Sequence, residues 1–317
     1  MRVLRVTDSN GRYVASLEEV DRPVARQGEV LVHVAASGVN RADLAQIAGR
    51  YPSPPGEPEG IGLEVSGTSE ATGETVCALL AGGGHAEYVA APEGQVMAVP
   101  AGIDLVAAGG MPEAFVTAFV MLVLEGGLSR GASLLVHAGA SGVGLAAIQV
   151  GKLVGARVAA TTRTADKVQA LKSAGADVAI DTGRYEFVAQ IEEHWGRDAV
   201  DVVLDPIGAA SLAGDVRVLA TGGRIVVIST LSGARAEVDL ALVMRKRARL
   251  IGSSLRPRSR PEKAAIMKRF REEILPGFAS GALRVTVDSA IPVGRAAEAF
   301  QRMRDNRNVG KILVTWH

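Results

Sequence analysis

The chain has 317 residues, 48% of them hydrophobic and 4% aromatic, with a formal net charge of +1. This length suits two domains, and the balanced charge with few aromatics argues against a protein built mainly to bind nucleic acid or an anionic membrane. The single cysteine, Cys77, excludes an intramolecular disulfide and fits a reducing compartment, so we expect a cytoplasmic protein.

The first third of the chain predicts a β-rich module. Gly, Pro and Asp turns separate five short strand candidates, at residues 3–7, 29–35, 62–67, 74–80 and 85–90. The Pro-rich segment 51–58 is expected to form a rigid extended loop. The longest apolar region, 106–124, contains Pro112 and Glu113, and we interpret it as a buried loop and core helix rather than a membrane span.

The centre of the chain alternates short apolar strands with helices of about ten residues. The predicted strands are 134–138, 157–162, 178–181, 200–205, 224–229 and 249–254, and the predicted helices are 143–154, 165–174, 185–195 and 209–219. This alternation indicates an α/β fold with a doubly wound parallel sheet, a Rossmann domain. Two later helices, 262–275 and 296–304, and a strand at 311–315 are expected to return to the first domain. The predicted boundaries are therefore 1–118, 119–255 and 256–317.

A dinucleotide fingerprint lies between the first strand and the first helix of this alternation. Gly142-x-Gly144-x-x-Ala147 supplies a Gly for the tight turn, a Gly for close approach of a pyrophosphate, and a small residue for helix–strand packing. The helix start offers unpaired N–H groups to phosphate. We therefore predict a cofactor site at Ser141, Gly142, Val143 and Gly144.

The end of the second strand predicts which dinucleotide binds. NAD-binding units place a carboxylate there, but this chain has Thr162 and Arg163, followed by Lys167. Hydroxyl and cationic groups suit a 2′-phosphate, so the prediction is NADPH. The alternative is that Arg163 and Lys167 are ordinary solvated residues at a helix start.

Further cofactor contacts are expected where the fifth and sixth strands end. Ser229 follows the fifth strand, and Ser254, Leu255 and Arg256 follow the sixth. Ligands of open α/β sheets bind at the carboxyl ends of the strands, so these residues join the predicted cofactor site.

Several motifs together resemble the medium-chain dehydrogenase/reductase superfamily. Its quinone oxidoreductase (zeta-crystallin-like) branch is similar at residues 39–44, 62–67, 82–89, 112–119, 137–144 and 308–313, and the subgroup of tumour-suppressor-inducible quinone oxidoreductases is similar at 40–56 and 78–89. The resemblance implies a β-rich GroES-like catalytic domain beside the Rossmann domain, and cofactor contacts from Thr117 and Asn308. It also implies a homodimer, for which 235–243 is the candidate edge strand and an amphipathic helix the alternative.

The comparison with zinc-dependent members of that superfamily shows which ligands are missing. Asn40 stands where they carry Cys, and Leu63 where they carry His, while one cysteine cannot build a four-cysteine site. The five histidines, His33, His85, His137, His194 and His317, are scattered without the spacing of a metal site. The sequence therefore predicts no metal.

The resemblance implies an NADPH-dependent, zinc-independent quinone reductase. Hydride addition to a quinone develops negative charge on oxygen, and Asn40 and Tyr51 are the predicted catalytic donors. The alternatives are a turn or cap role for Asn40 and loop packing for Tyr51. An enoyl reductase acting on a conjugated carbonyl or thioester is the second function, and a non-enzymatic RNA-binding role the third.

One feature of related proteins has no obvious counterpart in this chain. Many relatives carry a Tyr just after the third strand of the nucleotide domain, where it covers the phosphates. Here Thr182 stands at that place and Tyr185 follows three residues later. The sequence leaves open which of the two replaces it.

Overall fold

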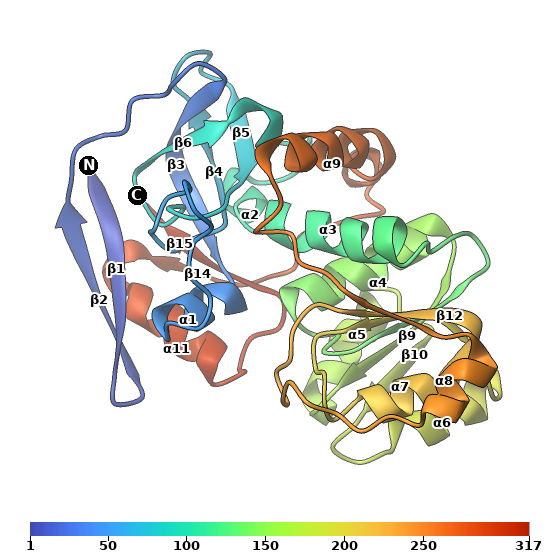
Figure 1. Ribbon diagram of the computed structural model, residues 1–317. Coiled ribbons are helices and arrows are strands. Elements are labelled where there is room, and N and C mark those ends of the chain that lie inside the picture. Colours follow the sequence, from blue (N-terminus) through green and yellow to red (C-terminus); the bar gives the residue numbers. More distant parts are fainter. Residues whose placement is uncertain (317) are drawn as a thin grey trace. The chain divides into compact units, whose positions relative to one another are not determined.

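The computed structural model describes residues 1–316, which form two compact units (Figure 1). Unit 1 consists of Met1–Val116 and the chain from Leu255 onward, and unit 2 is Thr117–Ser254. The chain therefore leaves unit 1 once and returns to it. The two crossings lie within two residues of the predicted boundary at 118/119 and within one residue of that at 255/256.

Unit 2 contains a six-stranded parallel sheet in the order β10-β9-β8-β11-β12-β13. Its strands are β8 (Ser133–Val136), β9 (Arg157–Thr162), β10 (Val178–Asp181), β11 (Val200–Asp205), β12 (Leu219–Val227) and β13 (Arg249–Gly252). Helices α4 (Gly142–Val154) and α5 (Val168–Ser173) cover one face, and α6 (Phe187–Trp195), α7 (Leu212–Val218) and α8 (Leu240–Lys246) cover the other (Figure 1). This arrangement confirms the predicted Rossmann sheet.

The sequence of the central strand and first helix explains why they form where they do. All four residues of β8 are buried, as a strand covered on both faces requires. Ser141 caps α4 by accepting a hydrogen bond from the N–H of Gly144. The helix ends at Gly155, whose φ of 91° is left-handed and favours glycine.

Unit 1 contains a seven-stranded sheet in the order β14-β15-β3-β4-β5-β7, with β6 paired to β3. Its strands are β3 (Glu29–Val39), β4 (Glu64–Ser69), β5 (Thr75–Leu79), β6 (Tyr88–Pro92), β7 (Val96–Ala98), β14 (Val287–Pro292) and β15 (Lys311–Thr315). The hairpin of β1 (Arg2–Ser9) and β2 (Arg12–Glu19) forms a separate two-stranded sheet. The antiparallel pairing of β15 with β3, register Ile312↔Val39, brings the end of the chain to the residues before Asn40.

Short helices complete both units. In unit 1 they are α1 (Arg41–Ile47), η1 (Glu93–Gln95), α2 (Leu105–Ala108), α9 (Arg260–Glu273), α10 (Pro276–Ala279), η4 (Val293–Arg295) and α11 (Ala296–Arg304). Helix α3 (Pro112–Phe119) continues into the π-helical turn η2 (Val120–Glu125), and η3 (Ala165–Lys167) precedes α5. Among residues 1–316, no helix is long and apolar enough to cross a membrane.

The structure corrects part of the element prediction. The sequence missed β2, β7 and β14, and strand β12 begins at Leu219, inside a predicted helix. Residues 235–243 do not form the expected edge strand, because Asp239 caps helix α8 by accepting from the N–H of Leu242. The edge of the parallel sheet is β13 instead.

Candidate functional site

The turn between β8 and α4 has the geometry of a phosphate site. The first-turn N–H groups of Gly142 and Val143 have no partner within the helix, as at every helix start. A Cβ at Gly144 would overlap the carbonyl oxygen of Ala138, so only glycine lets the helix start so close to the strand. The structure thus brings Ser141, Gly142, Val143 and Gly144 into one turn at a helix start, where backbone N–H groups suit an anion.

The end of β9 presents the residues predicted to select the cofactor. Thr162 is buried, whereas Arg163 is exposed and Lys167 ends the short helix η3. The carbonyl oxygen of Thr162 accepts hydrogen bonds from the backbone N–H (2.8 Å) and the hydroxyl (3.1 Å) of Thr182. Thr182 is therefore tied to the strand end, while Tyr185 is 55% exposed.

A buried His–Asp pair lies just before the dinucleotide turn. From the sequence, its histidine is expected only to lack the spacing of a metal ligand. His137 Nε2 is 2.7 Å from Asp215 Oδ1 on α7, and its Nδ1 is 3.0 Å from the Thr161 hydroxyl on β9. Burial lowers the pKa of His137, but the Asp215 carboxylate outweighs burial, so the net pKa is raised. The pair joins β8, β9 and α7 next to the turn. Its only signal in the sequence is a histidine at a strand end.

The remaining residues predicted to contact the cofactor differ in their burial and in their hydrogen bonds. The Thr117 hydroxyl on α3 is buried and has no hydrogen-bond partner within residues 1–316, so it is free to bond a ligand. Ser229 is half-buried beyond β12, and Ser254 is exposed beyond β13. Asn308 Nδ2 donates to the carbonyl oxygen of Gly310 at 2.8 Å.

A buried ionic cluster surrounds Asn40 in unit 1. Glu64 Oε1 is 2.6 Å from Lys311 Nζ and 3.0 Å from Asn40 Nδ2. Lys311 Nζ also donates to Asn40 Oδ1 at 2.6 Å, and Asn40 Nδ2 donates to the carbonyl oxygen of Gly38 at 3.1 Å. Both amide protons and the amide oxygen of Asn40 are thus engaged. The sequence did not reveal this cluster, since its charged members lie 247 residues apart and meet only through β15.

Glu113 lies beside this cluster, in the first turn of α3. Its backbone N–H donates to Glu64 Oε2 at 2.9 Å, but its own carboxyl group has no hydrogen-bond or ion-pair partner among the described residues. Burial, with the negative charge of Glu64, raises the pKa of Glu113 to about 8. In the sequence, Glu113 is visible only as an interruption of an apolar run.

Arg256 organises the Pro-rich loop rather than standing free for a ligand. It is 3% exposed and donates to Ala81 O (2.7 Å), Tyr51 O (3.1 Å), Gln46 Oε1 (2.8 Å) and Ser53 Oγ (2.9 Å). Its guanidinium lies 5.0 Å from the centre of the Tyr51 ring, and the neighbouring Leu255 is buried. The Tyr51 hydroxyl makes no hydrogen bond within residues 1–316, so it is available to a ligand.

The residues around Asn40 do not fit a zinc ion. No group of three His, Cys, Asp or Glu side chains among residues 1–316 is placed to hold a metal. Both carboxylates beside Asn40 are already bound: Glu64 by the Lys311 ammonium, and Asp43 by the backbone N–H groups of Asn40 (2.7 Å) and Gly62 (2.8 Å). Leu63 is fully buried and apolar. His317 lies outside the described residues.

The comparisons agree with this fold. The family "Zinc-binding dehydrogenase" matches residues 142–270, and the family "Alcohol dehydrogenase GroES-like domain" matches 26–82. Quinone oxidoreductases from Lama guanicoe and Homo sapiens are 27% and 26% identical, each over 99% of this chain and 97% of the relative.

Solved structures extend the likeness over the full chain. A quinone oxidoreductase from Thermus thermophilus, solved also in complex with NADPH, is 30% identical with a TM-score of 0.85, and both chains are covered completely. A mycobacterial protein complexed with NADPH is 28% identical with a TM-score of 0.86. This chain is an oxidoreductase of the medium-chain dehydrogenase/reductase superfamily. Within that superfamily it belongs to the quinone oxidoreductase branch. The finer subgroup likeness stays a prediction.

Proposed function

We propose that this enzyme is an NADPH-dependent, zinc-independent quinone reductase. The observation that carries the proposal is the Asn40–Glu64–Lys311 cluster, which places an ammonium group where a metal would need open ligands. Without a metal to polarise a carbonyl, hydride transfer suits an acceptor that is already activated by conjugation, as a quinone is.

The cofactor assignment uses unit 2. The turn at Ser141–Gly144 would bind the pyrophosphate, Arg163 and Lys167 the 2′-phosphate, and the free Thr117 hydroxyl the nicotinamide end. When bound, NADPH supplies the hydride. Ser229, Ser254 and Asn308 are proposed as further contacts. Leu255 and Arg256 are proposed to act indirectly, by packing.

The substrate assignment uses unit 1. Tyr51 offers a free hydroxyl and a half-buried ring on which a flat quinone can stack. Asn40 has no free amide proton, so we assign it a positioning role beside Glu64 and Lys311 rather than direct donation to the substrate.

The second candidate is an enoyl reductase acting on a conjugated carbonyl or thioester. It is supported by 28% identity to a segment of a phthiocerol polyketide synthase subunit of Mycobacterium tuberculosis, over 97% of this chain and 14% of the relative. Both reactions deliver hydride to a conjugated acceptor, so the fold alone does not separate them.

A substrate panel tests the proposal. Ortho-quinones, para-quinones, enones and enoyl thioesters are each assayed with NADPH and with NADH, and bound zinc is measured in the purified enzyme. We expect quinone turnover with NADPH preferred by about 10-fold or more, roughly the effect of one extra charge-assisted contact. Turnover of enoyl thioesters alone would favour the second candidate, and stoichiometric zinc would contradict the metal-free mechanism.

Tyr51→Phe tests the substrate side. Loss of the hydroxyl should lower kcat/KM for a quinone by about 10-fold, the effect of one hydrogen bond to a developing charge. The matched control is Tyr88→Phe, since Tyr88 stacks on His33 elsewhere in unit 1. Equal rates in wild type and Tyr51→Phe would return Tyr51 to a packing role.

A homodimer formed through β13 is part of the proposal. This edge strand presents Leu250, which is 61% exposed, and α8 adds Leu240 and Met244, each 76% exposed. Unpaired strand edges and exposed apolar groups favour pairing with a second chain. Light scattering should give a dimeric mass, and Leu250→Asp should give a monomer.

A further inference from the structure

We infer that Glu113 is the general acid of this enzyme, which protonates the oxygen that carries negative charge after hydride transfer to the acceptor. The inference rests on the proposed function for the identity of the acceptor. It concerns a residue that neither the sequence motifs nor the likeness to other proteins had assigned.

The first argument is the contrast between two neighbouring carboxyl groups. Glu64 is bound by three donors: the Lys311 ammonium (2.6 Å), the Asn40 amide (3.0 Å) and the backbone N–H of Glu113 (2.9 Å). The carboxyl group of Glu113 has none within residues 1–316. Donors to a carboxylate favour its charged form, so the carboxyl group of Glu113, which has no such donor, is the one whose surroundings favour the protonated form.

The second argument is the set of charges that face Glu113. Negative groups are Glu64 on β4 and Asp43 on α1, and positive groups are Lys311 on β15 and Lys263 on α9. Burial and Glu64 dominate and place the pKa of Glu113 at about 8, so at neutral pH it holds a proton that it can release. An acid with a pKa near the working pH is the kind that transfers protons efficiently.

The third argument is access to the predicted substrate groups. Glu113 is half-buried rather than sealed, and its charge acts on Tyr51 and on the charged groups around Arg256. Residues four apart in a helix lie on the same face, so α3 carries Glu113 and the free Thr117 hydroxyl on one side.

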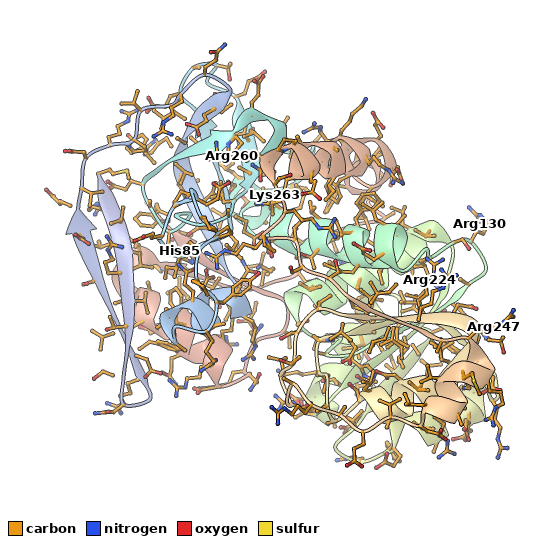
Figure 2. All side chains as sticks on the ribbon, in the orientation of Figure 1. His85, Arg130, Arg224, Arg247, Arg260 and Lys263 are labelled. Atoms are coloured by element: carbon orange, nitrogen blue, oxygen red, sulfur yellow. The ribbon has the colours of Figure 1, made fainter. Side chains whose placement is uncertain are left out.

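Lys263 supplies what a general acid needs after it has lost its proton. It lies on α9 (Figure 2), is 1% exposed, and its ammonium has no hydrogen-bond or ion-pair partner in the described part of the chain. Burial lowers the pKa of Lys263. The negative charges of Glu57 and Glu113 raise that pKa, and the positive charges of Arg260 and Arg256 lower it. Because its positive charge lowers the pKa of Glu113, Lys263 favours the Glu113 carboxylate once that carboxylate forms.

The proton step conserves atoms and electrons. Hydride transfer gives the quinone two electrons and one hydrogen, which leaves a hydroquinone with one negative oxygen. The O–H bond of Glu113 breaks, its proton forms the new O–H bond on that oxygen, and Glu113 is left as the carboxylate. Water returns a proton to Glu113 before the next turnover.

A measurement on the cofactor-free protein tests the protonation of Glu113 without any turnover. The infrared band of a protonated carboxyl group should disappear in the wild type between about pH 7 and about pH 9 and be absent in Glu113→Gln. Glu237→Gln, at an exposed position, is the matched control and should keep the band. No titrating band in the wild type would overturn the inference.

Kinetics then test the catalytic role. Glu113→Gln should lower kcat for quinones by about 10²-fold with unchanged NADPH affinity, and should abolish the fall in rate that the wild type shows above about pH 8. Lys263→Met should move that fall to higher pH, since Lys263 lowers the pKa of Glu113. An unchanged kcat and pH profile in Glu113→Gln would overturn the role.

The two experiments separate failure of this inference from failure of the proposed function. If the wild type reduces no quinone but the infrared band titrates as expected, the quinone proposal and the acid role in that reaction both fall, while the protonated Glu113 stands. If quinones are reduced and the band is missing, the proposed function stands and the acid is another group.

Discussion

Each unit of this enzyme buries a polar cluster next to predicted site residues, and these two clusters are built differently. The unit 1 cluster, Asn40–Glu64–Lys311, is ionic, and its carboxylate has three donors. The unit 2 cluster, Thr161–His137–Asp215, leaves the second oxygen of Asp215 buried without a partner among the described residues.

The unpaired carboxyl groups in or beside the two clusters differ in their access to solvent and ligands, and this access decides which of them can transfer a proton to a substrate. Asp215 is fully buried and His137 is 3% exposed, so no substrate reaches their cluster and it acts by holding elements together. The unpaired carboxyl group beside the unit 1 cluster belongs to Glu113, which solvent reaches. The two carboxyl groups thus have different roles, because a ligand can reach that of Glu113 but not that of Asp215.

The largest expected effect is on stability, from breaking the ionic cluster. Lys311→Met leaves Glu64 buried without its cation and should lower the free energy of unfolding of unit 1 by about 3–5 kcal/mol. The chain has two tryptophans, one in each unit, so urea unfolding of a Trp195→Phe background follows unit 1 through Trp316. Adding Glu64→Gln should recover part of the loss; no recovery would mean that Lys311 matters for packing alone.

Breaking the unit 2 cluster should have a smaller effect. Asp215→Asn should lower the stability of unit 2 by about 1–3 kcal/mol, the range for a buried hydrogen-bonded group that loses its partner. Asp215 raises the pKa of His137. The stabilisation of unit 2 by the His137–Asp215 pair is therefore full below about pH 6.5 and is lost as pH rises through the pKa of His137 in the folded state.

Trp195 fluorescence in a Trp316→Phe background measures this change, and Asp215→Asn should make the pH dependence flatter. A variant whose unfolding shows the wild-type pH dependence would contradict the assignment of a charged His–Asp pair.

The smallest expected effect is on cofactor choice. Arg163→Ala should weaken NADPH binding by about 10-fold and leave NADH binding unchanged, because only NADPH carries the 2′-phosphate. Arg245→Ala, at another exposed arginine of unit 2, is the control for net charge. Calorimetry measures the affinities for NADPH and NADH. If Arg163→Ala weakened the binding of both cofactors equally, Arg163 would act through its charge in general and not through the 2′-phosphate.

The wrong element predictions share a cause. Strand β2 has exposed or half-buried residues throughout, so no apolar alternation marks it. The segment 235–243 has apolar residues that fit a strand or a helix, and the capping by Asp239 decides for the helix. Strands β9, β10, β11 and β15 and helix α11 have the predicted bounds. The strands are short and nearly continuous buried runs, and the helix buries every third or fourth residue.

Local spacing in the sequence is enough to predict some parts of this enzyme. The dinucleotide turn and its capping serine lie within a few neighbouring residues, so their pattern predicts their geometry. The protonation of Glu113, in contrast, depends on contacts that form when the chain folds. Glu113, Glu64, Lys263 and Lys311 lie far apart in the chain, and the pKa of Glu113 depends on burial and on charges that meet through space.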